Sequence, residues 1–229
     1  MWAVVPLKSP ERAKTRLAGM LGAAQRRELL FELATRLIRA LQATPAIERV
    51  AVVTASPVVA DFARALGAQA LMQDVEAGTA AAFAAAIEQL RPRQLPRLLL
   101  IAGDLPLVTP AALDTLCAAP VDADWVIVPD RHHVGTNALL GAPQTLVPRF
   151  GHDSLRRHLA AARAAELRAL VLHSGALSLD LDHPDDFAEL RRRDARAADA
   201  LLAALPPTLP AIETGVLLGE PPLRLAGAR

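Results

Sequence analysis

A group of basic side chains follows the first apolar segment of the chain. Residues 2–7 read Trp-Ala-Val-Val-Pro-Leu, which predicts a buried strand, and Lys8, Lys14 and Arg16 follow in the next segment. In a parallel α/β sheet, the loops after the strands form the ligand crevice. Two ammonium groups and a guanidinium at this place are suited to the phosphate oxygens of a nucleotide. A solvated loop without a ligand is the alternative interpretation.

Three aspartates follow two other apolar segments. Asp104 comes after residues 97–102, the most hydrophobic stretch, and Asp180 and Asp182 lie at a predicted strand end near Leu179. Alternation along a strand puts Asp180 and Asp182 on one side, so both can face the crevice toward which Asp104 points. Converging carboxylates suit Mg²⁺ bridging phosphates, and no Cys/His cluster at ligand spacing points to zinc. A turn or capping role for Asp104 is the alternative.

Two polar stretches are candidates for binding a small anion. Thr136 and Asn137 open a predicted strand and offer hydroxyl and backbone donors. Residues 150–154 (Phe-Gly-His-Asp-Ser) precede a predicted helix, whose free N-terminal amides attract anions. Asp153 and Ser154 are also N-cap candidates, and capping is compatible with anion binding.

Four neighbouring polar residues are interpreted structurally. His132 and His133 are adjacent on an extended segment, so their side chains point opposite ways, and a loop role is favoured over metal binding. Asp185 and Asp186 lie in the first turn of a predicted helix, where the helix dipole favours acidic capping residues.

The hydrophobic pattern predicts the elements that position these residues. Strands are expected over residues 2–7, 50–54, 68–72, 97–102, 125–128 and 136–140. Helices are expected over residues 23–43, 58–66, 80–90, 110–117 and 154–165, and from 184 onward with 191–205 as a continuation. Strands that alternate with helices indicate a mostly parallel sheet, with residues 97–102 at its centre.

The composition excludes several classes of protein. The chain has 229 residues, of which 52% are hydrophobic and 21% charged, with a formal net charge of +1. These values are typical of a folded domain and give no bulk field to hold nucleic acid or an anionic membrane. The single cysteine, Cys117, is expected in the core, and we expect no signal peptide and no membrane span, which fits the cytoplasm. We expect one domain over residues 1–205 and a proline-rich tail over 206–229.

In order and spacing, the chain resembles the guanylyltransferases of coenzyme F-420 biosynthesis. The matching segments extend to about residue 190 and comprise residues 5–8 with 13–17, 103–106 (Gly-Asp-Leu-Pro), 135–139 (Gly-Thr-Asn-Ala-Leu), 150–154 and 180–182. The family joins GTP to a phosphorylated three-carbon acid, namely 2-phospho-L-lactate, phosphoenolpyruvate or 3-phosphoglycerate, and releases pyrophosphate. The implied fold is the Rossmann-like sheet of nucleotide-diphospho-sugar transferases, often found as a homodimer.

The resemblance also implies roles for individual residues. Asp104 and Asp182, with Asp180, would hold Mg²⁺. The GTP phosphates would meet Lys8, Lys14 and Arg16, and the carboxylate of the acid would meet Thr136, Gly151 and Ser154. Relatives tend to carry a Gly-Leu-Asn-type turn where this chain has Gly-Thr-Ala at residues 78–80, which leaves the guanine contacts open.

Two other functions fit parts of the pattern. A cytidylyltransferase or molybdopterin nucleotidyltransferase of the same fold would carry a similar aspartate and basic loop. A non-catalytic nucleotide-binding regulator would have no need of the acid-binding residues. The absence of a glycine-rich dinucleotide turn and of a P-loop disfavours a dehydrogenase or a P-loop ATPase.

Overall fold

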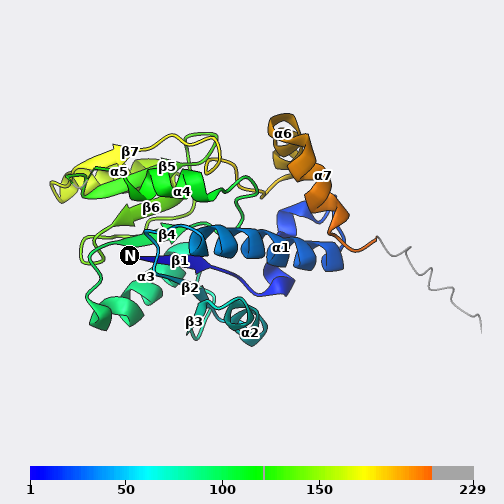
Figure 1. Cartoon of the computed structure of the whole chain (residues 1–229), viewed down its shortest axis with the longest axis horizontal. Helices are drawn as coiled ribbons and strands as arrows, with labels where there is room; N and C mark the ends of the chain where they lie inside the picture. The colour runs from blue at the N-terminus through cyan, green and yellow to red at the C-terminus, as the bar shows by residue number, and fades with distance from the viewer. Residues whose placement is uncertain (121, 208–229) are drawn as a thin grey trace, which may run out of the picture.

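The computed structural model describes residues 1–120 and 122–207 and contains one seven-stranded mixed sheet (Figure 1). The strands are β1 (Trp2–Pro6), β2 (Arg49–Thr54), β3 (Gln69–Met72), β4 (Leu98–Ile101), β5 (Trp125–Pro129), β6 (Thr136–Gly141) and β7 (Ala169–Val171). Their order is β3-β2-β1-β4-β6-β5-β7, and β6 runs antiparallel to both of its neighbours while the other pairs are parallel. The predicted α/β class and the central place of residues 97–102 are confirmed.

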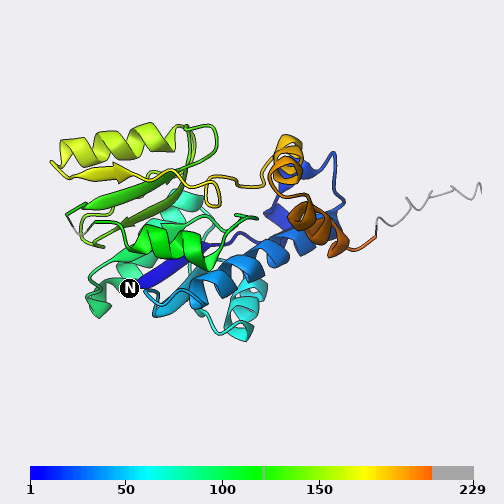
Figure 2. The same cartoon turned by 45° about the horizontal axis from the view of Figure 1, so that its top comes forward.

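Helices cover both faces of this sheet (Figures 1 and 2). They are α1 (Ala23–Gln42), α2 (Pro57–Ala65), α3 (Thr79–Leu90), α4 (Pro110–Cys117), α5 (Ser154–Ala164), α6 (Pro184–Arg193) and α7 (Ala195–Ala203). Alternate strand residues point to opposite faces, so Ala3 and Val5 pack with α1, α2 and α4, whereas Trp2 and Val4 pack with α3 and α5. Cys117 is buried in the first of these clusters, as predicted.

A third apolar cluster joins α6 and α7 to the basic loop, which comprises residues 8–22 after β1. Leu17 and Leu21 of that loop, with Leu29 and Leu33 of α1, pack against buried residues of α6 and α7 and of the segment before α6. The basic loop itself contains two short 3-10 helices, Pro10–Arg12 and Thr15–Leu17. The packing of the C-terminal helices therefore fixes the place of the basic loop.

The structure corrects two predictions and leaves a third, the proline-rich tail, untested. Residues 191–205 do not prolong α6, because Asp194 leaves the helical conformation and its side chain caps α7 by accepting from the Ala197 N–H at 2.9 Å. Residues 178–183 form no strand; instead, the Leu181 N–H donates to the Asp104 carbonyl at 3.2 Å. Of the predicted tail, residues 208–229 lie outside the described part of the chain.

Gly103 lets the end of β4 approach the end of β1 closely. A Cβ atom at this position would lie 2.6 Å from Leu7 Cδ2 and 3.2 Å from the Pro6 carbonyl oxygen. Both distances are shorter than ordinary van der Waals contact, so only glycine fits there without movement. The close approach brings Asp104 and the basic loop to the same edge of the sheet.

We predict that Gly103→Ala lowers the free energy of unfolding by about 1–3 kcal/mol, because the added methyl overpacks the junction of β1 and β4. Chemical denaturation measures this loss. Gly19→Ala is the matched control, since a Cβ there meets nothing within 4 Å, and its effect should stay within about 0.5 kcal/mol. Equal stability of the two variants would contradict the packing argument.

Candidate functional site

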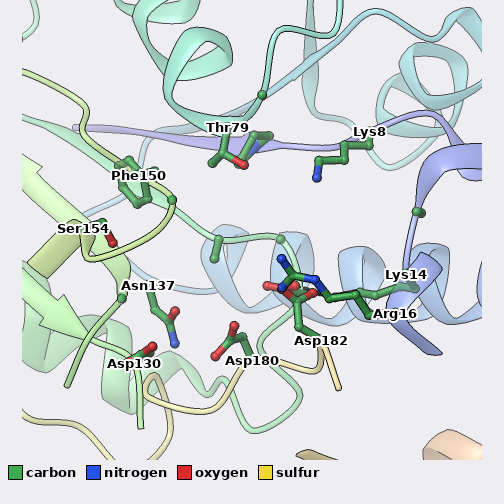
Figure 3. A pocket seen from close by; sticks show the side chains of 18 of the residues that line it. Lys8, Lys14, Arg16, Thr79, Asp130, Asn137, Phe150, Ser154, Asp180 and Asp182 are labelled. Atoms are coloured by element: carbon green, nitrogen blue, oxygen red, sulfur yellow. Dashed lines mark hydrogen bonds and ion pairs between the residues drawn. The ribbon is translucent and has the colours of Figure 1, made fainter. Parts of the chain in front are cut away.

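All of the predicted site residues line one cleft at the carboxyl ends of the parallel strands. The cleft has a volume of about 1170 Å³. Its lining includes each candidate from the sequence: Lys8, Lys14, Arg16, Asp104, Thr136, Gly151, Ser154, Asp180 and Asp182. Figure 3 shows Phe150 and Ser154 on one side and Lys14, Arg16 and Asp182 across the open space.

Three carboxylates meet at one point of this cleft. Oxygen atoms of Asp104, Asp180 and Asp182 all lie within 4.8 Å of one another. The backbone bond from Leu181 to Asp104 holds the two chain segments together, and the carboxylates of Asp180 and Asp182 both reach the cluster although no strand forms there. Burial, and then the charges of Asp104 and Asp182, raise the pKa of Asp180 to about 7.

The ammonium group of Lys14 lies against two of these carboxylates. Its Nζ is 2.5 Å from Asp104 Oδ2 and 3.1 Å from Asp182 Oδ1, and the side chain is 6% exposed. Burial alone would lower the pKa of Lys14, but the two carboxylates outweigh it and raise that pKa above its ordinary value. Lys14 adopts φ 54°, a left-handed conformation uncommon for a side chain of this kind.

Arg16 adds a second cation on the solvent side. Its guanidinium lies 3.4 Å from Asp182 Oδ2 and 63% of its side chain is exposed, so it is free to turn toward a ligand. Burial favours the neutral form of Asp182, yet Lys14 first, then Arg16 and Lys8, hold its pKa below the usual range. The cleft therefore has an anionic centre with cations around it.

Asp186 holds the backbone beside Asp182 in place, a role that the sequence predicted only in part. Its Oδ2 accepts from the backbone N–H groups of Asp182 (2.8 Å) and His183 (2.6 Å), which confirms the predicted capping role. Its Oδ1 also pairs with the Arg131 guanidinium at 2.7 Å, a long-range contact that no local pattern signals. Asp186 thereby fixes the backbone that carries Asp182.

The opposite wall is built by β6 and the start of α5. Ser154 is the first residue of α5 and Asp153 the N-cap, but the Asp153 side chain makes no cap bond and instead pairs with Arg156 at 2.5 Å. Asp153 is therefore the N-cap residue, as predicted, but its side chain does not cap the helix, and the alternative N-cap candidate, Ser154, is wrong. The Leu155 N–H donates to the Val134 carbonyl at 3.0 Å, which ties α5 to the turn before β6.

His158 is a buried residue of this wall that the sequence interpretation missed. Its Nδ1 lies 3.0 Å from Thr136 Oγ1, and its Nε2 accepts from the Arg149 N–H at 2.8 Å. Burial chiefly, with Arg157 and Arg149, lowers its pKa to about 4, against a smaller opposing effect of the Ser154 carbonyl. The sequence could have indicated this residue, because His158 lies four residues after Ser154 and therefore on the same face of the predicted helix.

The third side of the cleft lies near the start of α3. Gln73, Glu76, Gly78 and Thr79 line it. Glu76 accepts from the Ser9 N–H and pairs with Arg12 at 3.4 Å, so the segment after β3 is fastened to the basic loop. Of the two histidines interpreted as loop residues, His133 stacks on His173 with ring centroids 4.8 Å apart, outside the cleft lining.

The acidic centre fits a divalent cation by the chemistry of its donors. Hard carboxylate oxygens are the ligands that Mg²⁺ prefers, and carboxylates this close together need a positive charge between them. A cationic group, the Lys14 ammonium, already lies against two of the three.

Comparison with known proteins identifies the family. The family described as "Guanylyl transferase CofC like" matches residues 1–198. The chain belongs to this family. A phosphoenolpyruvate guanylyltransferase of Conexibacter woesei is 39% identical over 193 residues, covering 83% of this chain and 86% of the relative. One of Chloroflexus aggregans is 40% identical over 183 residues, covering 78% and 90%. The resemblance deduced from the sequence motifs is thus confirmed, and with it a nucleotidyltransferase enzyme.

Solved structures show the same fold in more distant proteins. A putative nucleotide-diphospho-sugar transferase from Desulfovibrio desulfuricans superposes with a TM-score of 0.72 at 17% identity, covering 88% of this guanylyltransferase-family chain and 93% of the other. A cytidylyltransferase from Leptospira borgpetersenii gives 0.54 at 12% identity, covering 88% and 92%. The predicted Rossmann-like nucleotidyltransferase fold is confirmed. Within residues 1–120 and 122–207, no helix has the length and hydropathy of a membrane span.

We predict that Lys14→Met lowers the free energy of unfolding in metal-free buffer by about 1.5–3 kcal/mol, because it removes the charged hydrogen bonds that offset carboxylate repulsion. Mg²⁺ should restore part of the loss. Lys8→Met is the matched control, since it makes the same charge change at an exposed position. A Lys14 variant as stable as this control would contradict the role of the ammonium.

The buried imidazole predicts a pH dependence of stability. The pKa of His158 is about 4 in the folded protein and ordinarily 6.5, so the unfolded chain takes up the proton first as the pH falls. The free energy of unfolding should therefore drop by up to about 3 kcal/mol between pH 6.5 and 4 on this account, a loss absent from His158→Gln. Denaturation curves across this range measure the difference. The control is His152→Gln at an exposed position, whose stability should change with pH as that of the parent protein does. If the stability of His158→Gln also falls with pH as that of the parent does, the lowered pKa of His158 is refuted.

Proposed function

We propose that this protein transfers the guanylyl group of GTP to the phosphate of a phosphorylated three-carbon acid and releases pyrophosphate. The observation that carries the proposal is the pairing, in one cleft, of an acidic centre ringed by cations with a polar wall at the start of a helix. The names of the relatives from Conexibacter and Chloroflexus favour phosphoenolpyruvate as the acid.

The reaction joins two anions, so the protein must supply positive charge that offsets their repulsion. A phosphate oxygen of the acid attacks the α-phosphorus of GTP, the bond from that phosphorus to the oxygen bridging to the β-phosphate breaks, and pyrophosphate leaves with the bond pair. The attacking oxygen is already ionised near neutral pH, so positive charge and alignment matter more than a general base.

Lys8, Lys14 and Arg16 supply that charge along the GTP phosphates. Arg16 offers two N–H groups in one plane for two oxygens, and its exposed position lets it swing to the ligand. Lys8, exposed on the same loop, contacts the outer phosphates, whose charge grows as pyrophosphate departs. Lys14 leaves its carboxylate partners only where another cation replaces it.

Asp104, Asp182 and Asp180 would hold Mg²⁺ at the acidic centre. When bound, the ion neutralises charge on the reacting phosphates and brings them together. Asp186 contributes by fixing the backbone N–H groups of Asp182 and His183, which keeps the Asp182 carboxylate aimed at the centre.

The opposite wall would receive the carboxylate of the acid. The Thr136 hydroxyl, the Ser154 hydroxyl and the backbone at Gly151 surround this part of the cleft, at the N-terminus of α5. The helix dipole attracts an anion, together with the first-turn amides of α5 other than the bonded Leu155 and Arg157 N–H groups. Gly151 adopts φ +116°, a conformation that residues other than glycine rarely adopt, and a Cβ atom there would meet nothing within 4 Å.

The direct test is an assay of the protein with GTP, Mg²⁺ and each of the three acids in turn, coupled to detection of pyrophosphate. We expect pyrophosphate release that requires an acid and is fastest with phosphoenolpyruvate. Release that is the same with CTP, or that occurs without any acid, would contradict the proposal.

We predict that Asp104→Asn lowers kcat by about a hundredfold or more, since losing one positioned charge at a reacting phosphate typically costs about 2.7–4 kcal/mol. Steady-state kinetics at saturating GTP and Mg²⁺ measure it. The control is Asp185→Asn, an equal charge change at an exposed rim residue of the cleft, which should stay within about threefold of the parent. Similar rates for both variants would remove Asp104 from the reaction.

We predict that Ser154→Ala raises KM for the acid about tenfold and leaves KM for GTP unchanged, as expected for one hydrogen bond to a charged group. Ser154 is not the N-cap of α5, so loss of capping would not explain such a change. Ser178→Ala, a hydroxyl outside the cleft lining, is the control. A rise in KM for GTP alone would exchange the two subsites.

A further inference from the structure

We propose that His158 is a positioning residue, which directs the hydroxyl proton of Thr136 into the cleft so that Thr136 donates to an anionic substrate. The identity of that substrate as a phosphorylated acid rests on the function proposed above. The position of the histidine proton rests on the hydrogen-bond geometry and burial of the ring, independently of that substrate.

His158 is enclosed among apolar and aromatic groups. Its side chain is 0% exposed, and its ring lies edge-on to Phe150 at 5.1 Å and to Trp125 at 6.4 Å between centroids. Both of its ring nitrogens nevertheless have partners, Thr136 Oγ1 at 3.0 Å and the Arg149 N–H at 2.8 Å. An imidazole held at both nitrogens in a dry place cannot exchange its partners freely.

The partner at Nε2 decides which nitrogen carries the proton. A backbone N–H can only donate, so Nε2 must offer a lone pair to Arg149. Burial and the nearby cations of Arg149 and Arg157 keep the ring neutral near pH 7, because they lower its pKa to about 4. A neutral imidazole has one N–H, which must then be at Nδ1, the nitrogen beside Thr136.

The tautomer in turn decides what Thr136 can do. A protonated Nδ1 has no lone pair, so whether its N–H is directed at Thr136 Oγ1 or at the nearby Ser154 carbonyl, it cannot accept the hydroxyl proton of Thr136, which points elsewhere. Thr136 lines the cleft and is itself 6% exposed, which leaves the cleft as the direction in which a partner can reach it. The site thus presents a fixed donor, which suits a carboxylate or phosphate oxygen and rejects a group that only donates.

The same ring connects the two halves of the polar wall. Thr136 belongs to β6, whereas Arg149 begins the 149–154 segment that leads through Gly151 to Ser154. A bond from His158 to each of them sets the spacing between the hydroxyl on the strand and the amides at the start of α5. Loss of the imidazole should therefore affect the acid and leave GTP binding as it was.

Nuclear magnetic resonance of the full-length protein labelled with ¹⁵N-histidine tests the tautomer without any substrate. The chain has six histidines, and the signals that disappear in His158→Gln identify His158. At pH 7 we expect a protonated Nδ1 and an unprotonated Nε2. An Nε2–H tautomer, or a doubly protonated ring, would overturn the inference.

A double-mutant comparison tests the action through Thr136. Calorimetry in Mg²⁺ gives the dissociation constants of phosphoenolpyruvate and GTP. We expect His158→Gln to weaken the acid about tenfold, as for loss of one charge-assisted hydrogen bond, and GTP by less than about twofold. In the Thr136→Val background, the same change should weaken the acid by less than about twofold. Equal losses in both backgrounds would overturn the inference, as would a wild-type protein that does not bind the acid.

The outcomes also separate this inference from the proposed function. Acid binding with the expected tautomer and the expected non-additivity, but without any guanylyl transfer, would contradict the proposed function and support the role of His158. Guanylyl transfer together with the Nε2–H tautomer would support the proposed function and overturn the role of His158.

Discussion

The mutual repulsion of three carboxylates is the constraint on which the rest of this structure depends. Asp104, Asp180 and Asp182 are brought together by the backbone bond between the Asp104 and Leu181 peptides and by the close approach at Gly103. Positive charge close to such a cluster offsets the repulsion among its carboxylates. The buried Lys14 ammonium provides that charge, and the C-terminal helices pack on the basic loop that carries it.

The two sides of the cleft differ in the groups that they offer to a ligand. One side carries charge, with the buried Lys14 and the exposed Arg16 beside the carboxylates, which suits a triphosphate whose charge is redistributed as it reacts. The other side offers hydrogen-bond donors in fixed orientations, because its hydroxyls and amides are held by a buried neutral imidazole and by the start of a helix. A substrate with a phosphate at one end and a carboxylate at the other matches this division.

Local patterns in the sequence predicted most of the fold and much of the site. Apolar runs such as residues 97–102 indicate buried strands, and the polar residues that follow such strands are expected at one edge of a parallel sheet. The structure agrees, since Asp104, Lys14 and Thr136 line one cleft. The contacts that the sequence did not reveal join distant segments. Arg131 with Asp186, and His158 with Thr136 and the Arg149 amide, depend on packing that no short motif encodes. The break at Asp194 was missed because the helical periodicity continues across it.

The most direct test of the central claim follows an isotope through the reaction. Phosphoenolpyruvate carrying ¹⁸O in the non-bridging oxygens of its phosphate is incubated with GTP, Mg²⁺ and the protein, and the products are analysed by mass spectrometry. If the acid attacks the α-phosphorus of GTP in this cleft, all of the label remains in the guanylylated acid and the pyrophosphate is unlabelled. Labelled pyrophosphate, or release of GDP in its place, would contradict the account.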